Sequence, residues 1–155
     1  MSISIREIFK NPEDFLDKEI VLSGWVKTSR ASKNFGFIEL TDGTVFKPIQ
    51  VVYGKELENV DEVEKFPISS SLEISGKIVK SPGKNQSYEL QASKIEAICS
   101  SNPSYPLQKK RHTMEYLRTI AHLRPRANTF NAVFRVRSLI AYAIHKFFQE
   151  KGFVY

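Results

Sequence analysis

The sequence predicts a mainly β domain built as a small five-stranded barrel, followed by a hinge and C-terminal helices. Three observations predict it. Apolar and polar residues alternate in five short runs between residues 19 and 98, which is the period of half-buried strands. A proline-containing stretch without this pattern follows at residues 100–106, and from residue 128 onward the apolar residues recur at helical spacing. With 155 residues, of which 41% are hydrophobic, the chain is long enough for one complete core and too short for two.

A short helix is predicted near the N-terminus. Ser4 and Glu7 have the spacing of a capping box, in which each side chain accepts a hydrogen bond from the backbone amide of the other residue. We expect this helix to begin at residue 5 and to end at residue 9 or 10, because Asn11-Pro12 follows. A polar turn then leads into the first strand.

A β-hairpin is predicted next, with strands at residues 19–30 and 35–41 joined by a short polar gap. In the second strand, Phe35 and Phe37 fall on the face opposite the aliphatic residues. Two rings close to the cation of Arg30 suit a nucleic acid, because a base can stack on a ring while cations meet phosphates. Composition alone leaves open the alternative that both rings belong to the core.

Three further strands and one helix complete the predicted barrel. β-Branched residues predict a third strand over 48–53, and alternation predicts a fourth over 72–79 and a fifth over 88–98. Between the third and fourth strands, apolar residues at three-residue spacing predict an amphipathic helix over 55–66. A turn is expected at residues 81–85.

Five short strands with a helix between the third and the fourth match the order of an OB-fold, a small barrel that commonly binds oligonucleotides. Another small barrel or a sandwich stays open at this point, because counting strands does not fix their topology. Lys and Arg outnumber Asp and Glu by 23 to 17, giving a net charge of +6. That surplus favours an anionic partner, although ordinary domains also carry it.

After the barrel, positive charge is concentrated beside the hinge. Residues 108–126 contain a single acid, Glu115, and six basic residues, Lys109, Lys110, Arg111, Arg118, Arg124 and Arg126. These residues form either a solvated helix face or a surface that binds an anion.

The last predicted element is a long helix that Asn128 or Thr129 caps and that ends near Gly152. Its apolar positions carry more surface than a five-stranded barrel across a hinge can cover. We therefore expect either that the chain is a piece of a longer protein whose core covers this helix, or that the helix pairs with another copy. The apolar, strand-like run at residues 153–155 favours the first explanation.

The sequence contains no pattern for a catalytic or metal site. Cys99 is the single cysteine, so an intramolecular disulfide and a cysteine-pair zinc site are excluded, and a reducing compartment is expected. His112, His122 and His145 lack the spacing and the partner residues of a metal site or a nucleophilic triad. No apolar run is long enough for a signal peptide or a membrane-spanning helix, and we expect a cytoplasmic protein with no membrane partner.

Several motifs in the barrel resemble the N-terminal anticodon-binding domain shared by aspartyl-, asparaginyl- and lysyl-tRNA synthetases. They are Gly24-Trp25-Val26 with Arg30, Phe37-Ile38-Glu39-Leu40, Ile49-Gln50-Val51 and Glu89-Leu90-Gln91-Ala92. The second half resembles asparaginyl-tRNA synthetases from their hinge into the first helix of the catalytic domain, through residues 105–112, 122–126 and 130–155. The resemblance covers essentially the whole chain.

This resemblance implies four RNA-binding residues. Phe37 corresponds to the ring that stacks on the middle anticodon base, a uridine, and Gln50 to the residue that hydrogen-bonds to the edge of that uridine. Glu89 corresponds to the carboxylate that recognises the first anticodon base, guanine in the asparagine and aspartate cases, and Arg30 to an arginine contacting the same nucleotides. A carboxylate suits the N–H donors of guanine, and an amide can both donate to and accept from uracil.

The resemblance also implies a domain plan. Residues 1–102 would form the OB-fold anticodon-binding domain, residues 103–112 the hinge, and residues 113–155 the start of a class II catalytic domain. The implied partner is the anticodon stem-loop of tRNA(Asn), and the implied full-length enzyme is a homodimer through the helix at 129–150.

The full-length enzyme would ligate asparagine to tRNA(Asn) with ATP and Mg²⁺. The motifs that bind ATP and carry out adenylation are absent from this sequence, so we expect the chain alone to bind no cofactor and to be inactive. Alternatives are the same domain of an aspartyl- or lysyl-tRNA synthetase, a non-catalytic OB-fold protein that binds single-stranded nucleic acid, and a purely structural dimerisation module.

Overall fold

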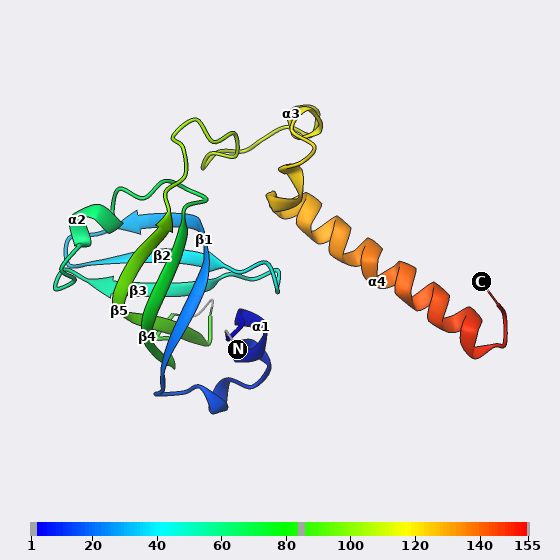
Figure 1. Ribbon diagram of the computed structural model, residues 1–155, viewed down its shortest axis with the longest axis horizontal. Coiled ribbons are helices and arrows are strands. Elements are labelled where there is room, and N and C mark those ends of the chain that lie inside the picture. Colours follow the sequence, from blue (N-terminus) through cyan, green and yellow to red (C-terminus); the bar gives the residue numbers. More distant parts are fainter. Residues whose placement is uncertain (1–2, 84–85, 155) are drawn as a thin grey trace. The chain divides into compact units, whose positions relative to one another are not determined.

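The computed structural model describes residues 3–83 and 86–154, so residues 84–85 of the predicted turn lie outside the described part. The chain divides into two compact units, Met1–Lys109 and Lys110–Tyr155. The first unit is a closed β-barrel with short helices, and the second unit is helical (Figure 1).

The barrel consists of five strands, β1 (Glu19–Ala31), β2 (Phe35–Thr41), β3 (Ile49–Gly54), β4 (Ser71–Lys80) and β5 (Tyr88–Cys99). Their order is β1-β2-β3-β5-β4, and the barrel closes because β4 also pairs with β1. Neighbouring strands are antiparallel except β3 and β5, which are parallel. This topology confirms the predicted OB-fold, and the strand boundaries lie within about one residue of those predicted from alternation.

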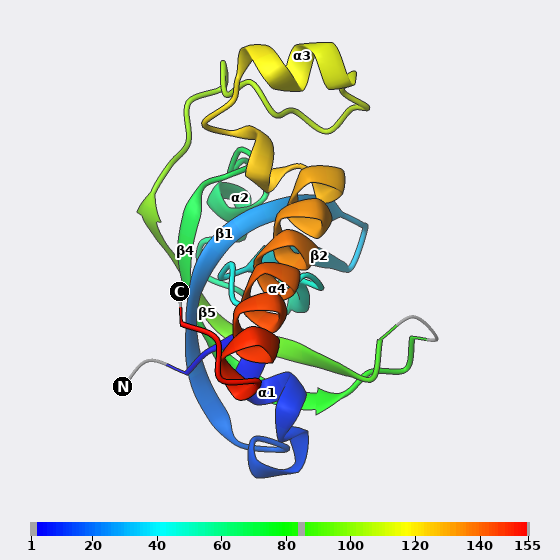
Figure 2. The same cartoon turned by 90° about the vertical axis from the view of Figure 1, so that its right-hand side faces the viewer.

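The long strand β1 bends around the barrel (Figure 2). Its first half pairs with β4, and its second half pairs with β2. Strict alternation from the buried residue Val26 would direct Arg30 into the barrel. A register shift between Val26 and Thr28 inserts one extra residue, Lys27, relative to β2. Because a shift of one residue moves the following side chains to the other face, Arg30 lies outside, opposite Phe37.

Aliphatic side chains from all five strands fill the barrel, and they include Leu22, Val26, Ile38, Leu40, Ile49, Val51, Leu72, Ile74, Ile78, Leu90 and Ile95. Tyr53 is buried among them with 1% of its surface exposed. Its ring occupies the space beside Gly36, where an added Cβ would collide with it. Gly36 therefore belongs to the core, although the phenylalanines on either side of it face outward.

The predicted N-terminal helix is confirmed as α1 (Ile5–Lys10), and its capping box is present. The Ser4 hydroxyl accepts a hydrogen bond from the Glu7 amide at 3.2 Å, and the Glu7 carboxylate accepts one from the Ser4 amide at 2.8 Å. Ile5 packs in the barrel core, and its amide donates to the Asp42 carboxylate at 2.8 Å. A 3₁₀ turn, η1 (Pro12–Asp14), lies within the predicted polar turn.

The helix between the third and fourth strands is shorter than predicted. It is α2 (Val60–Val63), whereas apolar spacing predicts a helix over 55–66. Asn59 is the N-cap residue of α2 but makes no side-chain capping hydrogen bond, and its side-chain amide nitrogen donates to the carbonyl oxygen of Ile95 at 2.8 Å. Val63, an apolar residue of the predicted helix, is nevertheless fully buried. Turns on both sides of α2 therefore take the place of the longer helix in holding the apolar residues of this segment.

The second unit contains α3 (Met114–Thr119), the 3₁₀ turn η2 (Arg124–Arg126) and α4 (Asn128–Glu150). The prediction that Asn128 or Thr129 caps the long helix is wrong. The turn η2 runs directly into α4 through Ala127, whose amide donates to the Arg124 carbonyl oxygen at 3.0 Å. Asn128 and Thr129 consequently lie inside the first helical turn.

The predicted end of α4 at Gly152 is confirmed. Gly152 has a φ of 84°, its amide donates to the Gln149 carbonyl oxygen at 2.9 Å, and the Phe153 amide donates to the Phe148 carbonyl oxygen at 3.1 Å. This pair of bonds is a Schellman motif, and the apolar contact that accompanies such motifs is present between the Phe148 and Phe153 rings, 5.4 Å apart. Phe153 and Val154 form no strand, and Tyr155 lies outside the described residues.

Candidate nucleic-acid interface

Four neighbouring strands present one outer surface that carries all four predicted RNA-binding residues. Cross-strand pairing arranges it in two rows over β1, β2, β3 and β5. The rows are Thr28, Glu39, Gln50 and Glu89, and Arg30, Phe37, Val52 and Gln91. We call these eight residues the outer face. Since neighbouring strands lie about 4.8 Å apart, side chains on adjacent strands can contact the same base.

Phe37 lies at the middle of the outer face and is half-buried rather than part of the core. The Arg30 guanidinium lies over its ring, 4.6 Å from the centroid, and the Phe35 ring meets its edge at 5.4 Å. Phe35 itself is 44% exposed. The structure therefore excludes the alternative that both rings belong to the core, and it brings Arg30 and Phe37 into direct contact.

Gln50 lies between two carboxylates, because it pairs with Glu39 on β2 and with Glu89 on β5. Its side chain is half-buried, and no hydrogen bond to its amide group occurs within the described part of the chain. Its neighbours in sequence, Ile49 and Val51, are fully buried, so the strand fixes the direction in which Gln50 points. An outward amide can offer both a donor and an acceptor to a flat ligand.

Glu89 belongs to the same row but is only 6% exposed. The loop between β4 and β5 covers it, since the Ser81 hydroxyl donates to Glu89 Oε2 at 2.7 Å and the Gln86 amide donates to the same oxygen at 3.1 Å. The structure brings the predicted carboxylate to Gln50 as expected. It also holds this carboxylate more firmly than a plain exposed strand residue would be held.

Sequence reasoning missed several residues of this surface. The Thr28 hydroxyl donates to Glu39 at 2.9 Å and so fixes a second carboxylate two positions from Phe37. Alternation along Phe-Ile-Glu-Leu already places Glu39 on the Phe37 face, and that signal could have found it. The contacts of Ser81 and Gln86 had no such signal, because they depend on how the loop closes.

Beyond the outer face, a further aromatic and cationic pair lies at the β2–β3 connection. The Lys27 ammonium group lies 5.7 Å from the centroid of the Phe46 ring, which is 48% exposed. Within residues 3–83 and 86–154, no group of three His, Cys, Asp or Glu side chains could hold a metal ion. The side chains of this surface offer aromatic rings for stacking, an amide and carboxylates for hydrogen bonding, and cations.

The basic residues between positions 109 and 126 differ in exposure and in their contacts. Arg124 lies over the rings of Phe130 and Phe134, at 5.0 and 5.6 Å from their centroids. Lys109, Lys110, Arg111 and Arg118 are exposed. The exposed members of this group can meet phosphates, whereas Arg124 is engaged at the start of α4.

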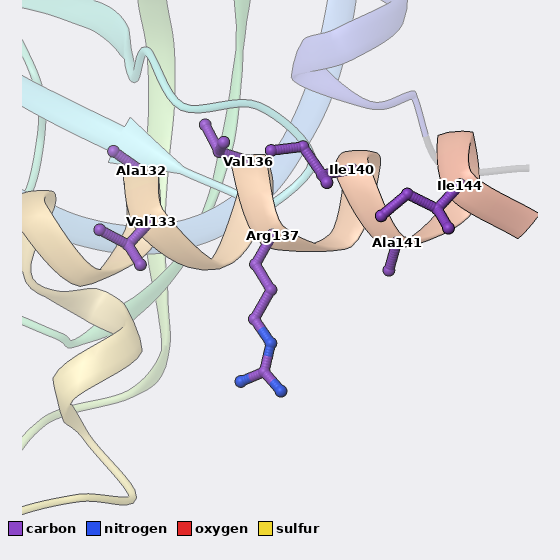
Figure 3. Close-up of a pocket in the computed structure, with 7 residues that line it drawn as sticks. All are labelled: Ala132, Val133, Val136, Arg137, Ile140, Ala141 and Ile144. Carbon is purple, nitrogen blue, oxygen red and sulfur yellow. The ribbon is translucent and has the colours of Figure 1, made fainter.

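A separate apolar surface runs along α4, whose residues include none that are buried. Figure 3 shows a shallow groove between two rows of side chains, Ala132, Val136, Ile140 and Ile144 in one row and Val133, Arg137 and Ala141 in the other. Rows of residues four apart are the ridges with which helices pack against one another. In the described part of the chain, no helix is both long and apolar enough to cross a bilayer.

The fold and the outer face define an OB-fold nucleic-acid-binding protein. The family model for the tRNA anti-codon OB-fold nucleic acid binding domain matches residues 20–98, about half of the chain. The chain belongs to this family.

Curated relatives carry the name asparagine–tRNA ligase. The protein from Clostridium tetani is 58% identical over 153 residues, and the protein from Acetivibrio thermocellus is 59% identical over 152 residues. These matches cover 99% and 97% of this chain but 33% of each relative. The chain thus spans about a third of the length of the curated relatives it matches.

Solved structures have the same fold. The crystal structure of asparaginyl-tRNA synthetase from Pyrococcus horikoshii matches with a TM-score of 0.84 at 22% identity, over 99% of this chain and 37% of that chain. The Entamoeba histolytica asparaginyl-tRNA synthetase in complex with asparaginyl-adenylate matches with a TM-score of 0.76 at 26% identity, over 89% of this chain and 34% of that chain.

Proposed function

We propose that this chain is the anticodon-recognition part of an asparaginyl-tRNA synthetase, together with the hinge and the first helix of its catalytic domain. The observation that carries the proposal is the convergence of Arg30, Phe37, Gln50 and Glu89 on one outer face of the barrel. The relative at 58% identity that bears the name asparagine–tRNA ligase supports the choice of amino acid.

The middle anticodon base, a uridine, stacks on Phe37. Single-stranded RNA is recognised by placing unstacked bases on aromatic rings and by hydrogen bonds to their exposed edges. Gln50, on the next strand and without an internal partner in the described residues, donates to and accepts from the uracil edge. Arg30, already in contact with the ring, meets the adjacent phosphate or base.

The first anticodon base is guanine, and Glu89 recognises it. The Watson–Crick edge of guanine carries two kinds of N–H donor, and an ionised carboxylate is an acceptor only. Glu89 pairs directly with Gln50 across β3 and β5, so two successive bases can be contacted from neighbouring strands. The basic residues at 109–126 add affinity for phosphates that depends on salt.

The domain plan of the proposal assigns residues 1–102 to the anticodon-binding domain, 103–112 to the hinge and 113–155 to the beginning of the catalytic domain. The division of internal contacts after Lys109 supports a hinge in that interval. The two halves of the chain also differ in kind, since the first is a β-barrel and the second is helical.

In the full-length enzyme, the helix at 129–150 forms a homodimer interface. The groove of α4 supports this, because large apolar side chains such as Val136 and Ile140, 56% and 52% exposed, lie along it without cover. Small residues, Ala132 and Ala141, would allow a second helix to approach closely.

The full-length enzyme ligates asparagine to tRNA(Asn) in the cytoplasm with ATP and Mg²⁺. This chain spans about a third of the length of its curated relatives, and in the proposal ATP and Mg²⁺ bind to the part of the enzyme that the chain does not span. The contribution of this chain to the reaction is the selection and positioning of the tRNA.

Binding measurements test the proposal. The 155-residue chain is titrated into labelled anticodon stem-loops of tRNA(Asn) and tRNA(Asp) and into a poly-uridine strand of equal length, at one salt concentration. We expect the tRNA(Asn) loop to bind at least about tenfold more tightly than the poly-uridine strand, because an edge-specific contact is added to stacking.

Equal affinity for the stem-loop and for poly-uridine would contradict the proposal and favour a non-specific single-strand binder. Tighter binding of the tRNA(Asp) loop, which differs at the third anticodon base, would favour the aspartyl enzyme. Dimers in sedimentation with no affinity for any RNA would favour a structural dimerisation module.

A further inference from the structure

The loop between β4 and β5 holds the Glu89 carboxylate through a small polar network. We propose that Ser81 and Gln86 are positioning residues that set the preference for the first anticodon base, by fixing Glu89 so that Oε1 is the oxygen offered to that base. This inference rests on the proposed function, because it assumes that Glu89 contacts the first base.

The backbone places Ser81 where it can reach Glu89. Ser81 follows directly after β4, and its amide donates to the carbonyl oxygen of Ser87 at 2.9 Å, which continues the pairing of Lys80 with Tyr88 by one step. The hydroxyl is therefore held by the sheet. It donates to Glu89 Oε2 at 2.7 Å across the mouth of the loop.

The network uses the full hydrogen-bonding capacity of the Ser81 hydroxyl and of the Gln86 amide nitrogen. The Gln86 amide nitrogen donates one hydrogen to Glu89 Oε2 and the other to Ser81 Oγ, both at 3.1 Å. Ser81 Oγ also accepts from the Gly83 amide at 3.2 Å, so its two lone pairs and its proton are all used. The opposite orientation of the Gln86 amide would place its oxygen, an acceptor, against the Glu89 carboxylate, which is also an acceptor. The orientation with the nitrogen towards Glu89 is therefore the favourable one.

Glu89 Oε2 thus accepts two hydrogen bonds, and Oε1 accepts none within residues 3–83 and 86–154. A carboxylate oxygen has two lone pairs, so Oε2 is saturated and Oε1 is the acceptor that remains. Because Glu89 is 6% exposed, the carboxylate cannot simply rotate into water. The loop thus leaves one carboxylate oxygen available on a residue that pairs with Gln50 across β3 and β5.

A fixed acceptor discriminates between bases more strongly than a mobile one. Guanine offers N1–H and N2–H donors to Oε1, whereas adenine offers a lone pair at N1, which the ionised oxygen repels. A free carboxylate would turn away from adenine and be hydrated, and much of the penalty would disappear. Because Ser81 and Gln86 hold Glu89 in place, the repulsion between its oxygen and adenine N1 remains. The affinity for adenine is therefore lowered relative to the affinity for guanine, and the difference between these two affinities is the specificity.

The test measures the affinity of the 155-residue chain for two anticodon stem-loops of tRNA(Asn), one with guanine and one with adenine at the first anticodon position. The variants are Ser81→Ala and Gln86→Leu, which remove the two donors, and Ser81→Thr, which keeps a hydroxyl. Ser87→Ala in the same loop is the matched control, because only its backbone takes part in the network. Thermal melting confirms that each variant is folded.

We expect the ratio of the two affinities to fall by about tenfold in Ser81→Ala and in Gln86→Leu, the effect of losing one hydrogen bond to a charged group. Ser81→Thr and Ser87→Ala should keep the ratio of the unmodified chain. A merely structural role would lower both affinities together and leave the ratio unchanged.

The outcomes separate this inference from the proposed function. If the unmodified chain binds both loops equally, the proposed role of Glu89 fails. If it prefers guanine and both variants keep that preference, the proposed function stands and the inference is overturned. Tighter binding of both loops by the variants, with an unchanged ratio, would also overturn it, because the loop would then be a cover that RNA displaces.

Discussion

Replacing Phe37 with alanine removes the centre of the outer face. The ring is half-buried on β2, with the Arg30 guanidinium 4.6 Å from its centroid. Stacking of one base on an aromatic ring contributes about 1–3 kcal/mol. Arg30 also loses the support that orients it, which adds about 0.5–1 kcal/mol at an exposed site. The total of about 1.5–4 kcal/mol corresponds to at least about tenfold weaker binding of the tRNA(Asn) stem-loop.

The same substitution should leave the barrel folded. Phe37 is outside the buried core, and its edge contact with Phe35 at 5.4 Å is the ring pair that is lost. Such a pair contributes about 0.5–1.5 kcal/mol. We expect a decrease in Tm of about 1–6 °C, measured by circular dichroism, and an unchanged spectrum at room temperature.

Two matched variants separate stacking from other effects. Phe37→Tyr keeps the ring and should retain most of the affinity in a fluorescence anisotropy titration, whereas Phe37→Leu keeps apolar volume and should not. Tyr142→Ala removes an aromatic ring that is 66% exposed on α4 and should leave binding unchanged. Unchanged affinity of folded Phe37→Ala would refute the assignment of this ring as the stacking platform.

Three further predictions concern stability and charge. Gly36→Ala should destabilise the chain by about 1–3 kcal/mol in urea unfolding, because the added methyl group collides with the Tyr53 ring; an unchanged midpoint would contradict the packing described here. Burial and, secondarily, the charge of Glu64 raise the pKa of Tyr53 in the folded chain. The contribution of Tyr53 to the free energy of unfolding is therefore complete below the pKa of the unfolded tyrosine, about 10. It decreases as the pH rises from that value towards the pKa of the folded state. Urea unfolding between pH 8 and 11 should show this decrease, and Tyr53→Phe should reduce it. Neutralising Lys109 and Lys110 with glutamine should reduce the slope of log affinity against log salt by about 1, and an identical slope would mean that neither lysine meets a phosphate.

Much of the barrel could be predicted because its signal is local. Alternation with a period of two fixed the extent of the strands, and it placed Phe37 and Gln50 outward from the residues on either side of them. The capping box of α1 and the glycine end of α4 depend on neighbouring residues in the same way. These features, which a few consecutive residues determine, were predicted correctly, whereas the start of α4 was not.

Two of the differences from the predictions involve partners that lie in another segment of the chain. The predicted helix over 55–66 is reduced to α2, and the side-chain amide nitrogen of Asn59, which precedes α2, donates to the Ile95 carbonyl oxygen, 36 positions away. Glu89 is buried because Ser81 and Gln86, in the loop between β4 and β5, donate hydrogen bonds to it. No spacing of residues in the sequence predicts these contacts. The fold class was therefore predictable, whereas the state of the carboxylate in the candidate site was not.

The extra residue in β1 makes the interface depend on how many residues the strand contains as well as on which they are. Deleting Lys27 would remove the extra residue, and regular alternation after the buried Val26 would still keep Thr28 and Arg30 outside. Adding one residue at this point would leave every interface side chain in the sequence, yet it would turn Thr28 and Arg30 toward the aliphatic interior, where an uncompensated charge is strongly disfavoured. A one-residue insertion near residue 27 should thus abolish RNA contact as thoroughly as replacing the contact residues. Anyone transplanting this interface onto another barrel would have to copy its strand length together with its side chains.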